Sequence, residues 1–366
     1  RERKPFANPS RADERATIEG RVPQRIGPDV ALGGGGFSED TAPPDALVAV
    51  PAATDGGWAV GETLAEARAK AGKVQGRRTT LAPTPPLALP PGDWHLTLRT
   101  TWVEPAYLEP DASWCAPGGE PSTPLANGGA FGGKVDSPAP RAARRLADEH
   151  GRAVRVVLSR EDTVRLGPKR PPIAAGLRAD GTGVIRVVRT PDIAERLTAV
   201  LPGIEVEEVD VAGPRTSAAL RAAGWAEAWV LRAALAGRAR VETPDGAVAS
   251  ARIEASTGAV HVTLDAGDPL DATVLRSYAI GAAHLALGWV TSEGIAVDGA
   301  GEVHDLTIRS FGILRAKDLP RIVVDVADAG RPPVHGSDAV FAAVAAAAWL
   351  ERGLPTDWPT ERGTLR

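Results

Sequence analysis

The chain has 366 residues, of which 43% are hydrophobic and 24% charged, a composition typical of a globular protein with about two domains. Its formal net charge of −4 offers no excess of basic residues, so we expect neither nucleic acid nor a membrane surface as a partner. The single cysteine, Cys115, excludes a disulfide within this sequence and a cysteine-ligated zinc or iron–sulfur site on it.

Targeting signals are sparse. Residues Arg1–Pro5 are mostly charged but no apolar segment follows them, so the sequence predicts no signal peptide and a cytoplasmic location. The longest apolar run, Ala339–Leu350, is shorter than the roughly 20 residues that cross a bilayer as a helix. The sequence contains no methionine, even at its first position.

Residues 1–43 are rich in glycine, proline and charge, and we expect an irregular N-terminal arm. The run Gly33–Phe37 within it is typical of a flexible connector, with an anion-binding loop as the alternative. A first α/β domain is expected over residues 44–212. The first predicted elements of this domain are a strand at Ala46–Val50 and a helix at Glu62–Lys73. A half-buried strand at Trp94–Leu98 follows and continues to Val103.

The most distinctive stretch is Asn127–Lys134, in which four glycines surround one phenylalanine and a lysine ends the run. Such a run leaves backbone N–H groups accessible and lets a large ligand approach the main chain closely. Ser137 and Pro138 then form an N-cap and first-turn pair, which predicts a helix that ends at His150 before Gly151.

A second domain is expected over residues 213–366, with mixed hairpins and helices. Turn residues at Asp245–Gly246 and Ser256–Gly258 bracket antiparallel strands. The pattern as a whole is α+β, with mixed and antiparallel sheets and packed helices. The remaining predicted elements are strands Arg155–Leu158, Gly183–Val188, Ile204–Val211, Val248–Glu254 and Val260–Leu264, helices Ser217–Leu235, Val274–Ser292 and Ser337–Arg352, and a hairpin turn at Asp298–Gly301.

The glycine loop resembles the loop of the molybdopterin-binding subunit in the xanthine dehydrogenase/aldehyde oxidase family. Further segments resemble that family in the same order along about 45–366. They are Val103–Pro110 around an L-E-P, Ala153–Glu161, Lys169–Pro171, Ile253–Val260, Leu264–Gly267, Gly281–Gly288, Glu293–Gly294 and Gly330–Pro333.

The resemblance implies a molybdopterin-type molybdenum cofactor and hydroxylation of an aldehyde or N-heterocycle. It also implies electron transfer to iron–sulfur and FAD subunits, or assembly with a second molybdopterin-domain chain. In the family this loop packs against the molybdenum centre, so the N–H groups of Phe131 and Gly132 would face its oxo ligand and Phe131 would wall the substrate side. The cofactor-binding residues that the resemblance implies are Gly128, Gly129, Ala130, Phe131, Gly132 and Gly133.

Several positions depart from the family pattern. The family's general-base glutamate in G-E-P-P is Arg331 here, and arginine cannot accept a proton. Tyr278 stands where the family's G-Q-x-x-G has its glutamine. Between about residues 213 and 252 the second cofactor-holding lobe is shortened, so a reduced lobe is expected. No catalytic residue can be assigned, and no protein ligand for a metal is expected. Arg331 is expected to make a structural ion pair, or to bind an anion.

Two alternatives remain for the loop. Gly128–Lys134 has the spacing of a phosphate-binding P-loop, but Val135 stands where a serine or threonine should hold magnesium, and the helix begins too late. A purely structural glycine turn stays open. Two functions therefore remain: a component of a molybdenum hydroxylase, or a catalytically degenerate relative acting as a scaffold or assembly protein.

Overall fold

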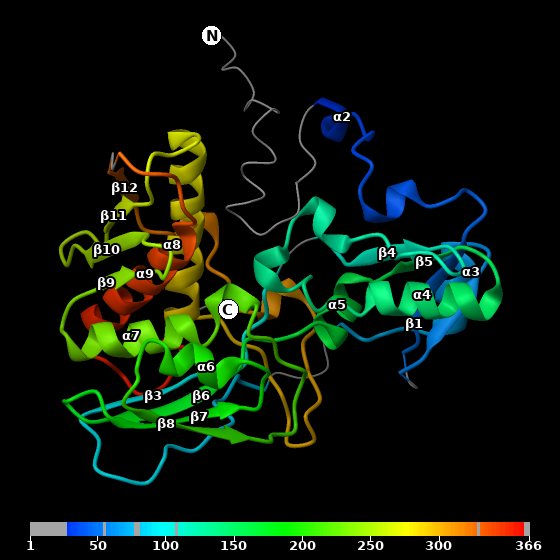
Figure 1. Ribbon diagram of the computed structural model, residues 1–366. Coiled ribbons are helices and arrows are strands. Elements are labelled where there is room, and N and C mark those ends of the chain that lie inside the picture. Colours follow the sequence, from blue (N-terminus) through cyan, green and yellow to red (C-terminus); the bar gives the residue numbers. More distant parts are fainter. Residues whose placement is uncertain (1–27, 54–55, 77–80, 107–108, 328–329, 362–366) are drawn as a thin grey trace. The chain divides into compact units, whose positions relative to one another are not determined.

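The computed structural model describes residues 28–53, 56–76, 81–106, 109–327 and 330–361 (Figure 1). The fold is α+β, as predicted, with three four-stranded sheets among its described elements. The chain divides into two compact units built from discontinuous segments. Unit 1 takes residues 1–79, 105–168 and 304–307, and unit 2 takes residues 80–104, 169–303 and 308–366.

Unit 1 contains one sheet in the order β2-β1-β5-β4, in which only the β1–β5 pair is parallel. Alternate residues of β1 enter opposite apolar layers: Leu47 and Ala49 pack with α4, whereas Val48 and Val50 pack with α3. The elements of unit 1 are α2 (Pro28–Ala31), η2 (Ser38–Thr41), β1 (Leu47–Pro51), β2 (Trp58–Gly61), α3 (Leu64–Ala71), β4 (Ala112–Cys115), η3 (Pro124–Asn127), η4 (Ala130–Gly132), α4 (Ala139–His150), β5 (Val154–Val157) and α5 (Arg160–Leu166).

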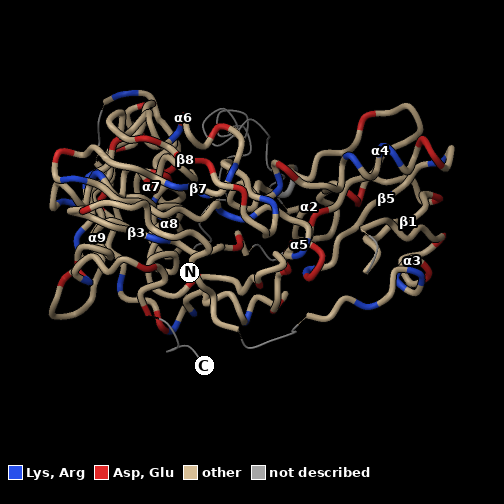
Figure 2. Tube along the Cα trace, turned by 90° about the horizontal axis from the view of Figure 1, so that it is seen from below, with Lys and Arg blue, Asp and Glu red and all other residues tan. Residues whose placement is uncertain are grey.

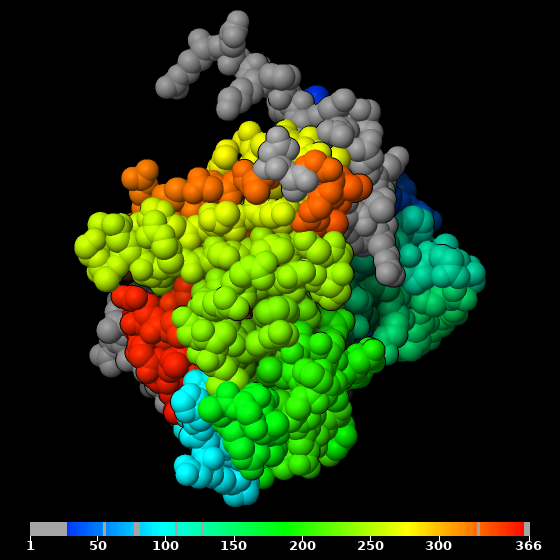
Figure 3. Space-filling model, turned by 60° about the vertical axis from the view of Figure 1, so that its left-hand side comes forward, coloured from blue at the N-terminus to red at the C-terminus, as the bar shows by residue number. Residues whose placement is uncertain are grey.

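Unit 2 contains two sheets, ordered β3-β6-β7-β8 and β12-β11-β10-β9. In the space-filling view of Figure 3, the cyan segment that carries β3 lies on the surface beside the green strands of its own sheet. The elements are β3 (Leu96–Arg99), β6 (Ile173–Leu177), β7 (Gly183–Val188), α6 (Ile193–Thr198), β8 (Ile204–Val209), η5 (Leu220–Ala222), α7 (Trp225–Leu235), β9 (Arg240–Glu242), β10 (Val248–Ile253), β11 (Val260–Asp265), α8 (Ala272–Thr291), η6 (Ile308–Ser310), η7 (Ala316–Asp318), β12 (Ile322–Val326) and α9 (Ser337–Glu351).

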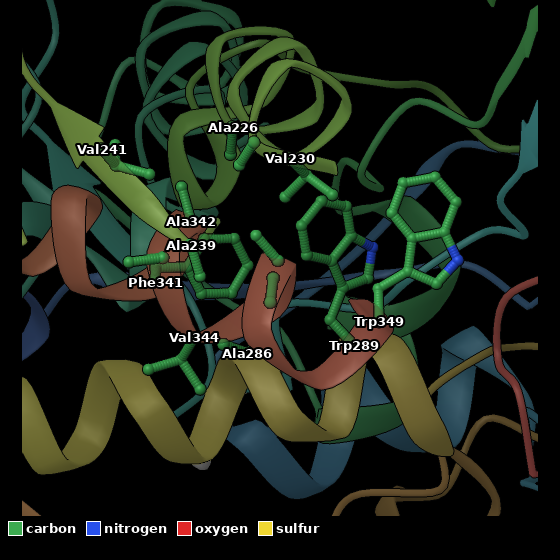
Figure 4. Packing of buried hydrophobic residues seen from close by; sticks show 14 of the residues in the cluster. Ala226, Val230, Ala239, Val241, Ala286, Trp289, Phe341, Ala342, Val344 and Trp349 are labelled. Carbon is green, nitrogen blue, oxygen red and sulfur yellow. The ribbon is translucent and has the colours of Figure 1, made fainter. Parts of the chain in front are cut away.

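The core of unit 2 forms around α9, which packs against α7, α8 and β10. Every residue from Ala339 to Trp349 is buried, and most are alanines, so neighbouring elements approach the helix closely on all sides (Figure 4). Trp289 of α8 stacks on Phe341 with ring centroids 5.1 Å apart. The apolar run Ala339–Leu350 is thus an interior helix, and no helix among the described residues is long and apolar enough to cross a membrane.

Several predicted elements are confirmed within two or three residues, including Gly183–Val188 and the helix that ends at His150. The half-buried strand predicted to continue to Val103 is shorter and ends at Arg99. Strand β4, which pairs with β5 upstream of the glycine loop, was not predicted from the sequence. The sequence analysis also missed β2, α5, β6, α6, β9 and β12.

The predicted helix Ser217–Leu235 is interrupted. Arg221 and Ala222 have φ angles of 44° and 55°, which an α-helix cannot accommodate. The Leu220 carbonyl accepts the Ala223 N–H at 2.7 Å in the short turn η5, and the guanidinium of Arg170 donates to the carbonyls of Leu220 and Arg221. A contact from outside the local sequence therefore decides where α7 begins.

The two units do not follow the linear division near residue 212. Residues 169–212, which the sequence assigns to the first domain, lie in unit 2. The reason is sheet pairing: β6, β7 and β8 complete a sheet with β3, which lies in the segment 80–104 of the same unit.

Candidate functional site

The glycine loop lies in unit 1 between η3 and α4 and contains the short turn η4. Three consecutive residues in it have left-handed backbone angles: Ala130 with φ 50°, Phe131 with φ 54°, and Gly132 with φ 92°. Only glycine adopts this region without strain, so Ala130 and Phe131 each cost roughly 1–3 kcal/mol. Backbone strain of this kind persists only where surrounding contacts hold it.

Hydrogen bonds inside the loop use some of its N–H groups. The Gly132 N–H donates to the Gly129 carbonyl at 3.0 Å, and the Gly133 N–H donates to the Ala130 carbonyl at 2.9 Å. Lys134 also donates its N–H to the Gly129 carbonyl, at 3.3 Å. These bonds do not use the N–H groups of Gly129 and Ala130.

The backbone at Gly129 and Ala130 has the alternation that forms an anion-binding nest. Gly129 is right-handed, with φ −84° and ψ −3°, and Ala130 follows with a positive φ. Successive N–H groups in this arrangement point toward a common anion. A Cβ built on Gly129 meets no atom within 4 Å, so space is open above the turn. The neighbouring side chains of Phe131 and Val135 are 49% and 57% exposed.

Lys134, which ends the loop, faces inward. Its side chain is 2% exposed, and its Nζ lies 3.0 Å from Oε2 of Glu109, whose own side chain is 47% exposed. A P-loop lysine would reach toward phosphates, and its helix would begin directly after it. Here α4 begins only at Ala139, and Val135 follows the lysine. The geometry therefore does not support a P-loop.

Unit 2 holds an unexpected cluster of buried charge. Three cations and three carboxylates, each at most 7% exposed, pair with one another: Lys169 with Glu104, Arg170 with Glu227, and Arg221 with Glu293. Burial lowers the pKa of the Lys169 amine, and the Glu104 carboxylate opposes that shift. Burial likewise lowers the pKa of Arg170, against the effect of Glu227.

Arg170 has several partners in this cluster. Its Nε and Nη2 donate to the two carboxylate oxygens of Glu227 at 2.7 and 2.9 Å, and its guanidinium lies 4.0 Å from the ring centroid of Trp289. Glu227 Oε2 also accepts the N–H of Gly224. Arg221, with its left-handed backbone, donates from Nη1 to Glu293 Oε2 at 2.7 Å. A bidentate, stacked guanidinium of this kind is a strong structural anchor.

Residues from separate motif segments meet in this cluster. Glu104, Lys169–Arg170 and Glu293 were each singled out as family-like in the sequence, and the fold brings them together through ion pairs. Arg221 and Glu227 were missed. The available signal was the placement of Glu227 among apolar residues of α7, since a glutamate on a buried helix face needs a partner.

Arg331, which the sequence resemblance aligned with a catalytic glutamate, makes a structural ion pair, and this confirms one of its two expected roles. Its Nη2 donates to Asp265 Oδ1 at 2.8 Å and to the Gly246 carbonyl at 2.7 Å. The adjacent turn is tight: a Cβ on Gly267 would lie 2.2 Å from the Pro332 carbonyl oxygen. Arg331 thus ties together three loops of unit 2.

No match to the chain was found among protein-family models or among curated protein sequences. Among solved structures, quinoline 2-oxidoreductase from Pseudomonas putida 86 is similar over 72% of this chain and 74% of its own, at 10% identity and a TM-score of 0.46. Reconstituted CO dehydrogenase from Oligotropha carboxidovorans is similar over 70% of this chain and 71% of its own, at 9% identity and a TM-score of 0.41. Aldehyde oxidoreductase from Desulfovibrio gigas is similar over 53% of this chain and 35% of its own, at 14% identity and a TM-score of 0.29. All three names denote oxidoreductases, and the likeness concerns the fold alone.

Among the residues that the structure describes, no group of three or more His, Cys, Asp or Glu side chains is arranged to hold a metal ion. Charged positions of both signs are interspersed along the trace in Figure 2. Within the described part of the chain, the backbone at Gly129–Ala130 has the arrangement of an anion-binding nest, which suits an anionic group held by backbone donors.

Proposed function

We propose that this chain is a molybdopterin-binding-subunit-like component of an oxidoreductase of the xanthine dehydrogenase/aldehyde oxidase type. The observation that carries the proposal is the loop Gly128–Gly133, whose sequence resembles the family's and whose backbone forms a nest at Gly129–Ala130 with open space above it. The substrate class under this proposal is an aldehyde or an N-heterocycle.

The loop fits an anionic group of a molybdenum cofactor in part. The N–H groups of Gly129 and Ala130 have the nest arrangement, and the exposed ring of Phe131 lies directly after them. The Gly132 N–H already donates within the loop, so a ligand would have to share that donor. We therefore place the principal backbone donors at Gly129 and Ala130, two residues before the pair Phe131 and Gly132 that the resemblance implies.

A bound molybdenum cofactor would supply oxygen transfer and electron acceptance, which no side chain of this protein provides. The residues described here would bind and orient the cofactor and exclude water from one side. Proton abstraction needs a base, and the Arg331 guanidinium cannot provide one. A second molybdopterin-domain chain would supply that base, and iron–sulfur and FAD subunits would take the electrons.

One observation favours the alternative function, a scaffold or assembly protein without catalysis. Arg331 donates hydrogen bonds to Asp265 and to the Gly246 carbonyl, so the position that corresponds to the family's base has a structural role here. A scaffold would keep the fold and lose the cofactor.

The test is to measure molybdenum and released pterin per mole of the chain, purified from a host that makes the cofactor. The wild type is expected to carry close to one equivalent of each, and Gly129→Asp is expected to carry almost none. That carboxylate would occupy the open space of the nest and repel an anion. Gly299→Asp is the matched control, because its Cβ also meets open space, in a turn of unit 2. If the folded wild-type chain carries neither molybdenum nor pterin, the proposed cofactor binding is rejected and the scaffold function remains.

A further inference from the structure

Two motif segments of unit 1 meet through one ion pair. Glu109 comes from the L-E-P segment and Lys134 from the end of the glycine loop, and their charged atoms lie 3.0 Å apart. The lysine is buried and the glutamate is half exposed. This asymmetry gives the pair one end fixed in the interior and one end open to solvent.

The lysine is also part of the loop's own hydrogen bonding. Its backbone N–H donates to the Gly129 carbonyl at 3.3 Å, which closes the turn over the left-handed residues Ala130, Phe131 and Gly132. A buried ammonium is costly unless a carboxylate compensates it. Removing the Glu109 carboxylate should therefore drive Lys134 toward water and pull on the residue that closes the loop.

We propose that the Glu109–Lys134 ion pair is a latch that holds the glycine loop in its strained conformation, so that Glu109 is a positioning residue for the anion bound there. The strain at Ala130 and Phe131 would relax once the end of the loop is free. The nest at Gly129–Ala130 would then lose its shape before any residue that touches the ligand is altered. The part of this inference that concerns the ligand rests on the proposed function, whereas the part that concerns the loop does not.

The neighbourhood of Glu109 is charged. The pKa of the Glu39 carboxyl is raised by burial, and the charges of Asp40 and Glu109 raise it further, against the effect of Arg155. Glu109 is thus set among carboxylates and still pairs with Lys134 at hydrogen-bonding distance. The Lys134 ammonium therefore offsets part of the negative charge around Glu109.

The experiment is amide hydrogen exchange over residues 128–135 of the full chain. In Glu109→Gln, exchange of the amides that are hydrogen-bonded within the loop, those of Gly132, Gly133 and Lys134, should rise about tenfold or more while β5 and α4 keep their protection. Glu109→Asp should restore part of the protection. The exchanged pair Glu109→Lys with Lys134→Glu should restore more than either single change. Glu120→Gln is the matched control, since Glu120 pairs with Arg144 at 3.8 Å on the surface of the same unit and is 95% exposed.

Unchanged exchange in Glu109→Gln would overturn the latch. If Glu109→Gln unfolds unit 1 as a whole, the double variant with Glu109→Lys and Lys134→Glu is the deciding measurement. A double variant that folds but leaves the loop amides unprotected would also overturn the latch. Molybdenum and pterin content are measured on the same samples. A protected wild-type loop that holds neither would reject the proposed function and leave the latch standing. Full cofactor in Glu109→Gln with a protected loop would reject the latch and leave the function standing.

Discussion

The glycine loop of unit 1 and the charge cluster of unit 2 use ion pairs in different ways. In unit 1 the Glu109–Lys134 pair has one end in water. In unit 2 the Arg170–Glu227 pair has both ends below 3% exposed, and its guanidinium also stacks on Trp289. In the first pair the glutamate can turn into solvent, whereas in the second both partners are enclosed by the core of unit 2. We therefore expect the geometry of the loop to adjust more easily than that of the charge cluster.

Breaking the buried pair should have the largest effect. Glu227→Gln leaves the buried Arg170 guanidinium charged and takes away the carboxylate that compensates it, so the free energy of unfolding of unit 2 should fall by about 3–5 kcal/mol. Guanidinium denaturation followed by tryptophan fluorescence measures this, because Trp58 and Trp114 lie in unit 1 and the other seven of the nine lie in unit 2.

The control for that measurement is Glu208→Gln, which removes a partner of Arg189 at the exposed edge strand β8. An exposed pair of this kind contributes about 0–1 kcal/mol. If Glu227→Gln and Glu208→Gln lower the free energy of unfolding equally, the burial of an ion pair does not determine how much it stabilises unit 2.

Placing a glutamate at position 331, as the proposed resemblance would have it, should have an intermediate effect. Arg331→Glu removes the bonds to Asp265 and to the Gly246 carbonyl and places two carboxylates together, so it should cost about 1–2 kcal/mol. We expect no gain of hydroxylase activity, because the loops around this position are built for a cation. Arg331→Gln separates the loss of the bonds from the added repulsion. An active, undiminished Arg331→Glu protein would contradict the structural reading of Arg331.

The smallest expected effect is the pH dependence of Glu39. Its folded pKa is raised above 4.5, chiefly by burial, so its ionised form is disfavoured in the folded state. The stabilising contribution of the protonated group is complete below the unfolded pKa and is lost as pH rises through the folded pKa. Glu39→Gln should flatten the pH dependence of unit 1 melting in the window that begins near pH 4.5 and extends upward. Carboxyl titration by NMR measures the same shift directly, and an ordinary value would refute it.

Local sequence signals were sufficient for elements that carry their own start and stop residues. The helix ending at His150 stops at a left-handed Gly151, where the sequence indicated, and starts one residue later than predicted, with Pro138 rather than Ser137 at the N-cap. Strand β6, Ile173–Leu177, is buried along its whole length and has no alternation to mark it. Its partners, β3 and β7, identify it only in three dimensions.

The site shows the same division. The glycine loop could be found from composition alone, and its lysine could not be assigned a direction, because the partner Glu109 lies 25 residues away. The clustering of Lys169, Arg170 and Arg221 with three carboxylates depends on tertiary contacts among four separate segments. A single sequence contains no pattern that brings such positions together.

The alanines of α9 have a consequence for how this chain can vary. Because α9 is in contact with α7, α8 and β10, the size of its side chains sets the distance between these elements. Enlarging one of these alanines by even two methylenes would push a whole layer outward, at a cost of about 1–3 kcal/mol. Substitutions in unit 2 should therefore accumulate on its strands and turns and be rejected along residues 339–348.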